Sequence, residues 1–167
     1  MADPDGLERL WAPYRMEYVR DSAKETGCPF CAIVAGERQT ELLVARGEHC
    51  FVTMNLFPYN PGHLMVLPNR HEAELTALSL EESTELTALT QHAIRATRVI
   101  STPHGFNVGL NLGSAAGGSI SQHLHQHVVP RWGGDANFMT IVGRTKTLPQ
   151  TVAQSADLLR SVWEEVA

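Results

Sequence analysis

Two stretches of the chain repeat apolar residues at the three- and four-residue steps of a helix. The first runs from residue 81 to 101, and its apolar face is formed by Leu86, Leu89, Ala93, Ala96 and Ile100. Glu81 and Glu82 stand at its start, where the positive end of a helix favours negative charge. The second stripe comprises Val152, Ala156, Leu159, Trp163 and Val166. These patterns predict two main helices, the second near the C-terminal end of the sequence.

Short apolar runs bounded by turn residues predict five strands. Residues 41–54 form an expected hairpin with its turn at 46–48, and residues 63–67 form a third strand between Pro-Gly and Pro. Strands at 105–111 and 122–130 follow the first helix. Five short strands and two main helices indicate an α+β domain with an antiparallel sheet.

The chain is long enough for one domain with a sizeable core, because it has 167 residues of which 43% are hydrophobic. We expect this single domain to span residues 28–167. Residues 1–27 look like an N-terminal arm that is too short to fold alone. The apolar face of the arm is formed by Leu7, Leu10, Trp11 and Tyr14. The arm would pack on its own domain or on a second protomer.

Charge and hydropathy exclude several classes of partner. The chain carries 13 Lys and Arg against 18 Asp and Glu, a formal charge of -5, and it has no long basic run. Nucleic acids and acidic membranes bind clustered positive charge, so neither is an expected partner. The N-terminal segment has no basic patch followed by an apolar core, and no apolar run approaches membrane-spanning length. We therefore expect a soluble, cytoplasmic protein.

Three histidines, His123, His125 and His127, alternate with other residues in the expected strand at 122–130. Alternate side chains leave the same face of a strand, so this spacing predicts three imidazoles in a row. Imidazole has an unperturbed pKa of about 6.5, so such a row can supply a nucleophile, a proton donor and an orienting partner. A metal-binding histidine tract or an exposed polar strand face is the alternative interpretation.

The segment before this row, residues 111–122, is rich in glycine, serine and alanine. Small residues let backbone N–H groups approach an anion closely, as phosphate-binding loops do, although many such stretches are plain turns. A histidine row preceded by this loop is typical of phosphoryl or nucleotidyl chemistry. We expect the Gly118 backbone and the side chains of Ser119 and Asn111 to hold phosphates. The indole of Trp132 can stack on an adenine, or it belongs to the core or an interface.

Cys28 and Cys31 form a Cys-Pro-Phe-Cys motif whose spacing suits a metal or a redox dithiol. A redox pair is expected to lead directly into a helix within a βαβ pattern, which the sequence does not show, so metal binding is favoured. The third cysteine, Cys50, is expected to be a small buried residue on a strand. An odd number of cysteines argues against a secreted disulfide framework.

The sequence resembles the histidine triad (HIT) family of nucleotidyl hydrolases and transferases, whose signature is His-x-His-x-His-x-x with apolar x positions. The resemblance covers most of the chain, because residues 61–68, Pro-Gly-His-Leu-Met-Val-Leu-Pro, look like the family's upstream strand. Asn55 stands eight residues before His63, where family members carry an asparagine that contacts the base or ribose. Gln126 departs from the family pattern, because an apolar residue is usual at that position.

The resemblance implies roles for these residues. The family uses its middle histidine, here His125, to attack an α-phosphorus and form a nucleotidyl-histidine intermediate, which a neutral imidazole is able to do. His127 is then well placed to hydrogen-bond the leaving or entering phosphate and to assist proton transfer. His63 would lie behind the triad as a supporting partner, or be an ordinary core histidine. Asn55 and Gln126 are included among the expected substrate contacts.

The resemblance also implies a structural zinc ion. Some HIT proteins and the related uridylyltransferases pair a Cys-x-x-Cys motif with a histidine just after the third strand and with the first triad histidine. In this sequence the four ligands would be Cys28, Cys31, His71 and His123, a closed tetrahedral set that leaves His125 and His127 for chemistry. The rival ligands are His49 and His104, because the sequence does not fix distances. His92, on a helix, is expected to be an ordinary residue.

Gln126, residues 9–15 and residues 105–111 resemble one branch of the family, the actinobacterial proteins that phosphorolyse diadenosine tetraphosphate. The implied reaction releases ATP and transfers AMP to inorganic phosphate to give ADP. The alternatives are a HIT hydrolase of dinucleoside polyphosphates or adenosine phosphoramidates, and a nucleotide-binding module without turnover. The implied partners are a dinucleoside polyphosphate or adenine nucleotide, inorganic phosphate, and further copies of the chain in a homodimer or tetramer.

Overall fold

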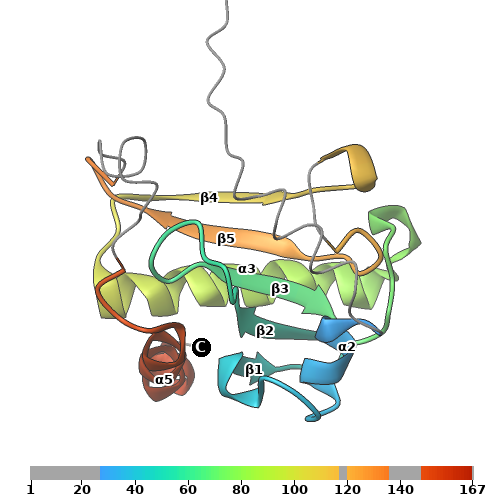
Figure 1. Cartoon of the computed structure of the whole chain (residues 1–167), viewed down its shortest axis with the longest axis horizontal. Helices are drawn as coiled ribbons and strands as arrows, with labels where there is room; N and C mark the ends of the chain where they lie inside the picture. The colour runs from blue at the N-terminus through green and yellow to red at the C-terminus, as the bar shows by residue number, and fades with distance from the viewer. Residues whose placement is uncertain (1–26, 117–119, 136–147, 167) are drawn as a thin grey trace, which may run out of the picture.

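The computed structural model describes residues 27–116, 120–135 and 148–166, which form a five-stranded antiparallel sheet and three α-helices (Figure 1). The strand order is β1-β2-β3-β5-β4. The strands are β1 (Leu43–Arg46), β2 (Cys50–Met54), β3 (Leu64–Pro68), β4 (Gly105–Leu110) and β5 (Gln126–Arg131). The helices are α2 (Pro29–Val34), α3 (Leu80–Ser101) and α5 (Val152–Trp163). Short 3₁₀ turns are η1 (Thr40–Leu42), η2 (Leu75–Ala77), η3 (Ser114–Ala116) and η4 (Glu164–Val166).

The expected α+β class and five-stranded antiparallel sheet are therefore confirmed. The expected N-terminal arm lies outside the described residues except for its last residue, Gly27. In the part of the chain that the structure describes, no helix is both long and apolar enough to cross a membrane.

The larger core lies between the sheet and the helices α3 and α5 (Figure 1). Alternate residues of the strands point into it, as the two-residue period of a strand requires. The strand residues in this core include Cys50, Val52 and Met54 of β2, Leu64 and Val66 of β3, and Val128 of β5. Cys50 is fully buried, as the sequence predicts. Apolar burial of this kind is the main favourable contribution to folding.

The short helix α2 packs on part of the opposite face of the sheet, over β2 and β3. Its Phe30, Ile33 and Val34 pack with the other set of strand residues, which are Phe51, Met65 and Leu67. Met65 is paired with His127 across β3 and β5. Because directly paired residues point to the same face of a sheet, His127 lies on the α2 side.

Helix α3 begins and ends where its sequence signals require. Ser79 accepts the Glu82 N–H, and the Glu82 side chain accepts the Ser79 N–H in return, so the two residues form a capping box. At the other end, Thr102 adopts a left-handed conformation with φ of 43°, and Pro103 cannot continue the helix.

Two local expectations differ from the structure. The last strand begins at Gln126 and not at residue 122, because the preceding histidines leave the sheet and the Leu124 N–H donates to the Glu72 carbonyl. The Cys-x-x-Cys motif leads directly into α2, which the sequence pattern did not predict. Its six residues are too few to show a helical period, and tertiary packing of Phe30 stabilises it instead.

The turn between β1 and β2 is held by Glu85 of α3. Its Oε1 accepts the Glu48 N–H at 2.9 Å, and its Oε2 accepts the N–H groups of His49 and Cys50 at 2.5 and 2.7 Å. A Cβ atom on Gly47 would lie 2.3 Å from Glu85 Oε1, so the close approach requires glycine. One carboxylate therefore fixes the hairpin to the helix.

We expect Glu85→Ala to lower the free energy of unfolding by about 1.5–3 kcal/mol, because backbone donors lose a charged acceptor. Urea denaturation measures this loss. Gln91→Ala, at an exposed position of the same helix, is the matched control and should change stability by less than about 0.5 kcal/mol. An equal effect of the two substitutions would mean that the turn does not depend on Glu85.

Candidate active site and metal centre

Four histidines gather on the α2 side of the sheet. His63 stands directly before β3, His127 lies on β5, and His123 and His125 come from the segment that precedes β5. The His127 ring centroid lies 5.0 Å from those of both His63 and His125. Phe30 of α2 contacts His123 and His125, with centroid distances of 5.6 and 5.3 Å. All four imidazoles are buried, with at most 8% of each residue exposed.

A chain of hydrogen bonds fixes where His127 carries its proton. The Tyr59 N–H donates to His63 Nδ1 at 3.0 Å, so the His63 proton must be on Nε2. His63 Nε2 lies 2.9 Å from His127 Nδ1 and donates to it. His127 therefore carries its own proton on Nε2.

Two asparagines border this chain. Nδ2 of Asn55 lies 3.3 Å from His63 Nδ1, and Oδ1 of Asn55 accepts the Phe57 N–H at 3.0 Å. Nδ2 of Asn111 lies 3.3 Å from His127 Nε2. Because an amide nitrogen only donates, a protonated His127 Nε2 requires the Asn111 amide to be flipped, with its oxygen toward the ring. The structure therefore brings both predicted asparagines to the histidine cluster.

His125 has the opposite tautomer. Its Nδ1 lies 2.8 Å from the His123 main-chain carbonyl, which can only accept, so Nδ1 carries the proton. Burial lowers the pKa of His125, and the hydrogen bond to the carbonyl opposes part of this shift. The result is a neutral imidazole with its lone pair on Nε2, the form that a phosphorus nucleophile needs.

The His123 ring makes its hydrogen bonds away from His125 and His127. Its Nε2 donates to the Pro68 carbonyl at 3.0 Å, which leaves the lone pair on Nδ1. Burial lowers its pKa to about 4, with smaller contributions from His71 and His125 and an opposing one from the Pro68 carbonyl. A neutral imidazole oriented by a carbonyl is the usual state of a metal-binding histidine.

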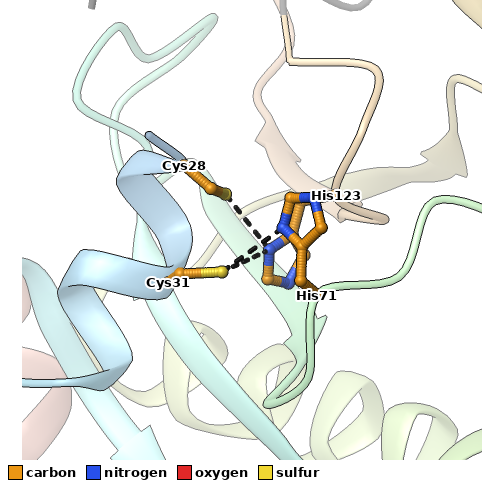
Figure 2. Close-up of side chains that lie close together, drawn as sticks. All are labelled: Cys28, Cys31, His71 and His123. Atoms are coloured by element: carbon orange, nitrogen blue, oxygen red, sulfur yellow. Dashed lines mark hydrogen bonds between the residues drawn. The ribbon is translucent and has the colours of Figure 1, made fainter. Parts of the chain in front are cut away.

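The lone pair of His123 faces the predicted metal ligands (Figure 2). Nδ1 of His123 lies 3.3 and 3.6 Å from the sulfur atoms of Cys28 and Cys31, and Cys31 Sγ lies 3.3 Å from His71 Nδ1. All four ligand atoms lie within 4.8 Å of one another. Zinc bonds of about 2.0–2.3 Å give a tetrahedron with edges of about 3.3–3.8 Å. The donor set and these three distances of 3.3, 3.3 and 3.6 Å therefore suit a tetrahedral zinc ion.

The two thiols lie close to two imidazoles. Burial raises the pKa of Cys31 to about 11, and the neighbouring Cys28 adds to this shift. A raised pKa favours the protonated thiol, and a divalent cation reverses this preference because it binds the thiolate. The helix after Cys28 removes one sequence-based objection to a redox dithiol. The two imidazoles beside the sulfur atoms still favour a metal.

Two predicted substrate contacts are not brought to the histidines. Gln126 is paired with Val66 and lies on the α3 face of the sheet, where its Nε2 donates to Thr90 Oγ1 at 2.6 Å. Trp132 follows β5, and its Nε1 donates to the Ser101 carbonyl at the end of α3. Successive side chains of a strand point to opposite faces, so Gln126 points away from the face that carries His127. The hydrogen bond to Thr90 explains why a polar residue stands at this position.

Gly118 and Ser119, the expected phosphate ligands, lie outside the described residues. His49 and His104, the rival zinc ligands, are not in the metal-binding group that the described residues form. His92 stacks on a tryptophan of α5 with a centroid distance of 4.1 Å, so it helps to join α3 to α5.

Two residues that the sequence did not single out shape the site. The Tyr59 ring lies 4.6 Å from that of His63 and 5.5 Å from that of His127, and its N–H sets the tautomer of His63. Phe30 contacts the rings of both His123 and His125. Tyr59 stands only four positions before His63, so the sequence could have suggested a contact between the two. The role of Phe30 depends on where α2 packs, which the sequence does not show.

The sheet and histidine cluster define a histidine triad domain. A family model described as HIT domain matches residues 37–134, and the chain belongs to this family. A Zn-bound histidine triad family protein from Mycobacterium smegmatis is a similar solved structure, with a TM-score of 0.68 and 30% identity over 86% of this chain and 96% of that one.

The chain is also similar to the AP-4-A phosphorylase of Mycobacterium tuberculosis. The two sequences are 51% identical over 95% of this chain and 86% of the relative. A uridylyltransferase structure has a TM-score of 0.70 and 19% identity over 95% of this chain and 53% of that one, which shows a shared fold.

The hydrogen bonds predict distinct tautomers for the neutral histidines. His125 should be protonated on Nδ1, and His63 and His127 on Nε2. Two-bond correlation spectra of ¹⁵N-labelled protein at about pH 8 distinguish the two forms, because neutral imidazoles dominate there. His104, whose Nδ1 accepts the Gly133 N–H at 2.9 Å, is an internal reference for the Nε2 form. Protonation of His127 on Nδ1 would contradict the hydrogen-bond chain.

Proposed function

We propose that the chain is a nucleotidyltransferase that cleaves diadenosine tetraphosphate by phosphorolysis to ADP and ATP. The observation that carries this proposal is the His125 hydrogen bond to the His123 carbonyl, which leaves a lone pair on Nε2 of a buried, neutral imidazole. The 51% identity to an AP-4-A phosphorylase supports the substrate and the phosphate acceptor.

In the first step the lone pair on His125 Nε2 attacks an α-phosphorus and forms a P–N bond. The bond from that phosphorus to the bridging oxygen breaks, and ATP leaves with the electron pair. The Nε2 proton of His127 stabilises the charge that develops on the phosphate oxygens. The intermediate is AMP bound covalently to His125, so one difficult substitution becomes two easier ones.

In the second step an oxygen of inorganic phosphate attacks the same phosphorus. The P–N bond breaks, its electron pair returns to His125 Nε2, and ADP is released. The carbonyl of His123 holds the proton on Nδ1 throughout. The ring is therefore ready for another attack without a change of tautomer.

The asparagines and the small-residue loop are the proposed substrate contacts. Asn111 is placed by its contact with His127 to bind a phosphate oxygen, and Asn55 is the proposed contact to base or ribose, supported by its position beside His63. Gly118 and Ser119 remain proposed phosphate ligands on the evidence of the sequence. Gln126 and Trp132 are not included.

Other acceptors and substrates define the rival activities. Water in place of phosphate would make the protein a hydrolase of dinucleoside polyphosphates, and a P–N bond to AMP would be cleaved by the same nucleophile. Both alternatives are compatible with membership of the HIT domain family. A nucleotide-binding module without turnover is less well supported, because binding alone does not require the tautomers described above.

We also propose that Cys28, Cys31, His71 and His123 hold a structural zinc ion. The fit of the four ligand atoms to a tetrahedron and the Zn-bound relative from Mycobacterium smegmatis support this proposal. Bound zinc supplies no chemistry to the reaction because all four positions are taken by protein. His123 would then fix its carbonyl, and with it the ring of His125.

The proposed assembly is a homodimer or a tetramer in the cytoplasm. β4 is an edge strand, and Val108 on it and Leu112 after it are 46% and 45% exposed. An exposed apolar edge is a surface that a second copy can cover. The proposed domain spans residues 28–167, with residues 1–27 as an arm on this domain or on a partner.

The product pattern should depend on phosphate. With diadenosine tetraphosphate and inorganic phosphate, ADP and ATP should accumulate in equal amounts, because phosphate accepts the AMP group. Without phosphate, turnover should be slow and give AMP and ATP. Chromatography of the nucleotides measures both. If AMP and ATP form at the same rate with and without phosphate, the hydrolase interpretation replaces phosphorolysis.

Two variants control this experiment. His125→Ala should abolish turnover while nucleotide affinity stays within about tenfold, because the nucleophile is a chemical requirement but only one of many contacts. His104→Ala, which changes an exposed histidine, should retain full activity. Substantial turnover by His125→Ala would remove this residue from the proposed role.

Purified protein should contain about one zinc ion per chain, because the four ligands form a single closed site. Cys28→Ser and Cys31→Ser should lower the zinc content and the Tm, since a ligand that binds only the folded state stabilises it. Cys50→Ala is the matched control and should keep its zinc, because Cys50 lies in the other core. Elemental analysis that finds no zinc in protein purified without chelator would contradict the proposal.

A further inference from the structure

Arg70 lies outside the histidine cluster but is joined to it by hydrogen bonds. Its Nε and Nη2 donate to the two carboxylate oxygens of Glu82 at 2.6 and 3.1 Å. Its Nη1 donates to Glu72 Oε2 at 2.6 Å, and Nη2 also donates to the Ala77 carbonyl at 2.8 Å. A planar guanidinium with a fork of donors can make this set of bonds, whereas an ammonium group cannot.

Glu82 is a rigid anchor for this arrangement. It is 8% exposed and belongs to the first turn of α3. Its Oε2 accepts the Ser79 N–H at 2.8 Å, and its own N–H donates to Ser79 Oγ at 3.2 Å. The capping box therefore holds the carboxylate that holds Arg70.

Glu72 is held at both oxygens of its carboxylate. Oε2 accepts from Arg70, and Oε1 accepts the N–H groups of Ala73 and Glu74 at 2.8 and 2.9 Å. These bonds fix the main chain at residue 72 relative to α3. In the sequence, His71, one of the proposed zinc ligands, stands between Arg70 and Glu72.

The main-chain carbonyl of Glu72 accepts the Leu124 N–H at 2.5 Å. This N–H and the His123 carbonyl belong to the same peptide unit, which is planar. The His123 carbonyl in turn accepts the Nδ1 proton of His125 at 2.8 Å. Holding the N–H edge of the peptide therefore holds the carbonyl edge, and donation by the N–H strengthens the carbonyl as an acceptor.

We propose that Arg70 is a positioning residue for His125. It fixes residue 72, residue 72 fixes the peptide between His123 and Leu124, and this peptide fixes the orientation and tautomer of the His125 ring. The consequence for the reaction rests on the role proposed above for His125. The structural part of the inference does not depend on the substrate.

The first test reads the His125 ring directly. An imidazole N–H that is buried and bonded to a carbonyl exchanges slowly with water, so the Nδ1 proton should give a protected NMR signal. The signal is assigned by its loss in His125→Ala. In Arg70→Met it should exchange at least about tenfold faster, since the carbonyl is no longer held. An unchanged exchange rate overturns the inference whatever the enzyme's substrate.

The second test separates positioning from stability by kinetics with diadenosine tetraphosphate and phosphate. Arg70→Lys keeps the charge but loses the fork, and Glu72→Gln keeps the main-chain carbonyl but weakens the pair with Arg70. Each should lower kcat about tenfold with KM within about twofold, measured well below its Tm, because a displaced nucleophile affects the chemical step. Zinc content should stay unchanged, which excludes an effect through His71.

Arg160→Lys is the matched control. Arg160 also donates to main-chain carbonyls, those of Glu41 and Leu43, and pairs with Asp157, but it lies on α5. It should lower the Tm without changing kcat. If Arg70→Lys and Arg160→Lys behave alike, Arg70 has only a structural role and the proposal is wrong. If the wild type shows no phosphorolysis, the proposed function fails, and the NMR test still decides the proposal on Arg70.

Discussion

The antiparallel pairing of β3 with β5 is the constraint on which the site depends. It pairs Met65 with His127, so that His63, two residues before Met65, can donate to the ring of His127 at 2.9 Å. The pairing ends at Gln126, and the chain before it leaves the sheet to reach the metal ligands. A slip of one residue would turn His127 toward α3 and bring Gln126 to the site.

Hydrogen bonds from main-chain groups set the tautomers of the clustered histidines. The Tyr59 N–H makes His63 a donor to His127. The His123 carbonyl leaves the lone pair of His125 on Nε2, and the Pro68 carbonyl leaves that of His123 on Nδ1. Burial lowers the pKa of His123 and His125 and so keeps both neutral. Backbone groups do not titrate, so the donors and acceptors that set these tautomers do not change with pH.

Periodicity predicted the strands, α3 and α5 because a buried face forces apolar residues to recur at the period of the element. It failed for α2, whose six residues are too short to show a period, and for the start of β5. The metal-binding group was predicted from the family resemblance, because no spacing along the chain shows that His71 meets Cys31. Gln126 was predicted as a substrate contact but lies on the α3 face, because its partner Thr90 is 36 residues away in the sequence.

Residue types at short spacings were enough to predict the family and the antiparallel sheet, and they led to the proposal that His125 is the nucleophile. The folded structure was needed to assign the protonated ring nitrogen of each histidine in the cluster and to find that Arg70 is joined to the site through the peptide of His123 and Leu124. The reason is physical: a hydrogen bond between distant segments depends on packing in three dimensions, and single residues carry no local signal of it.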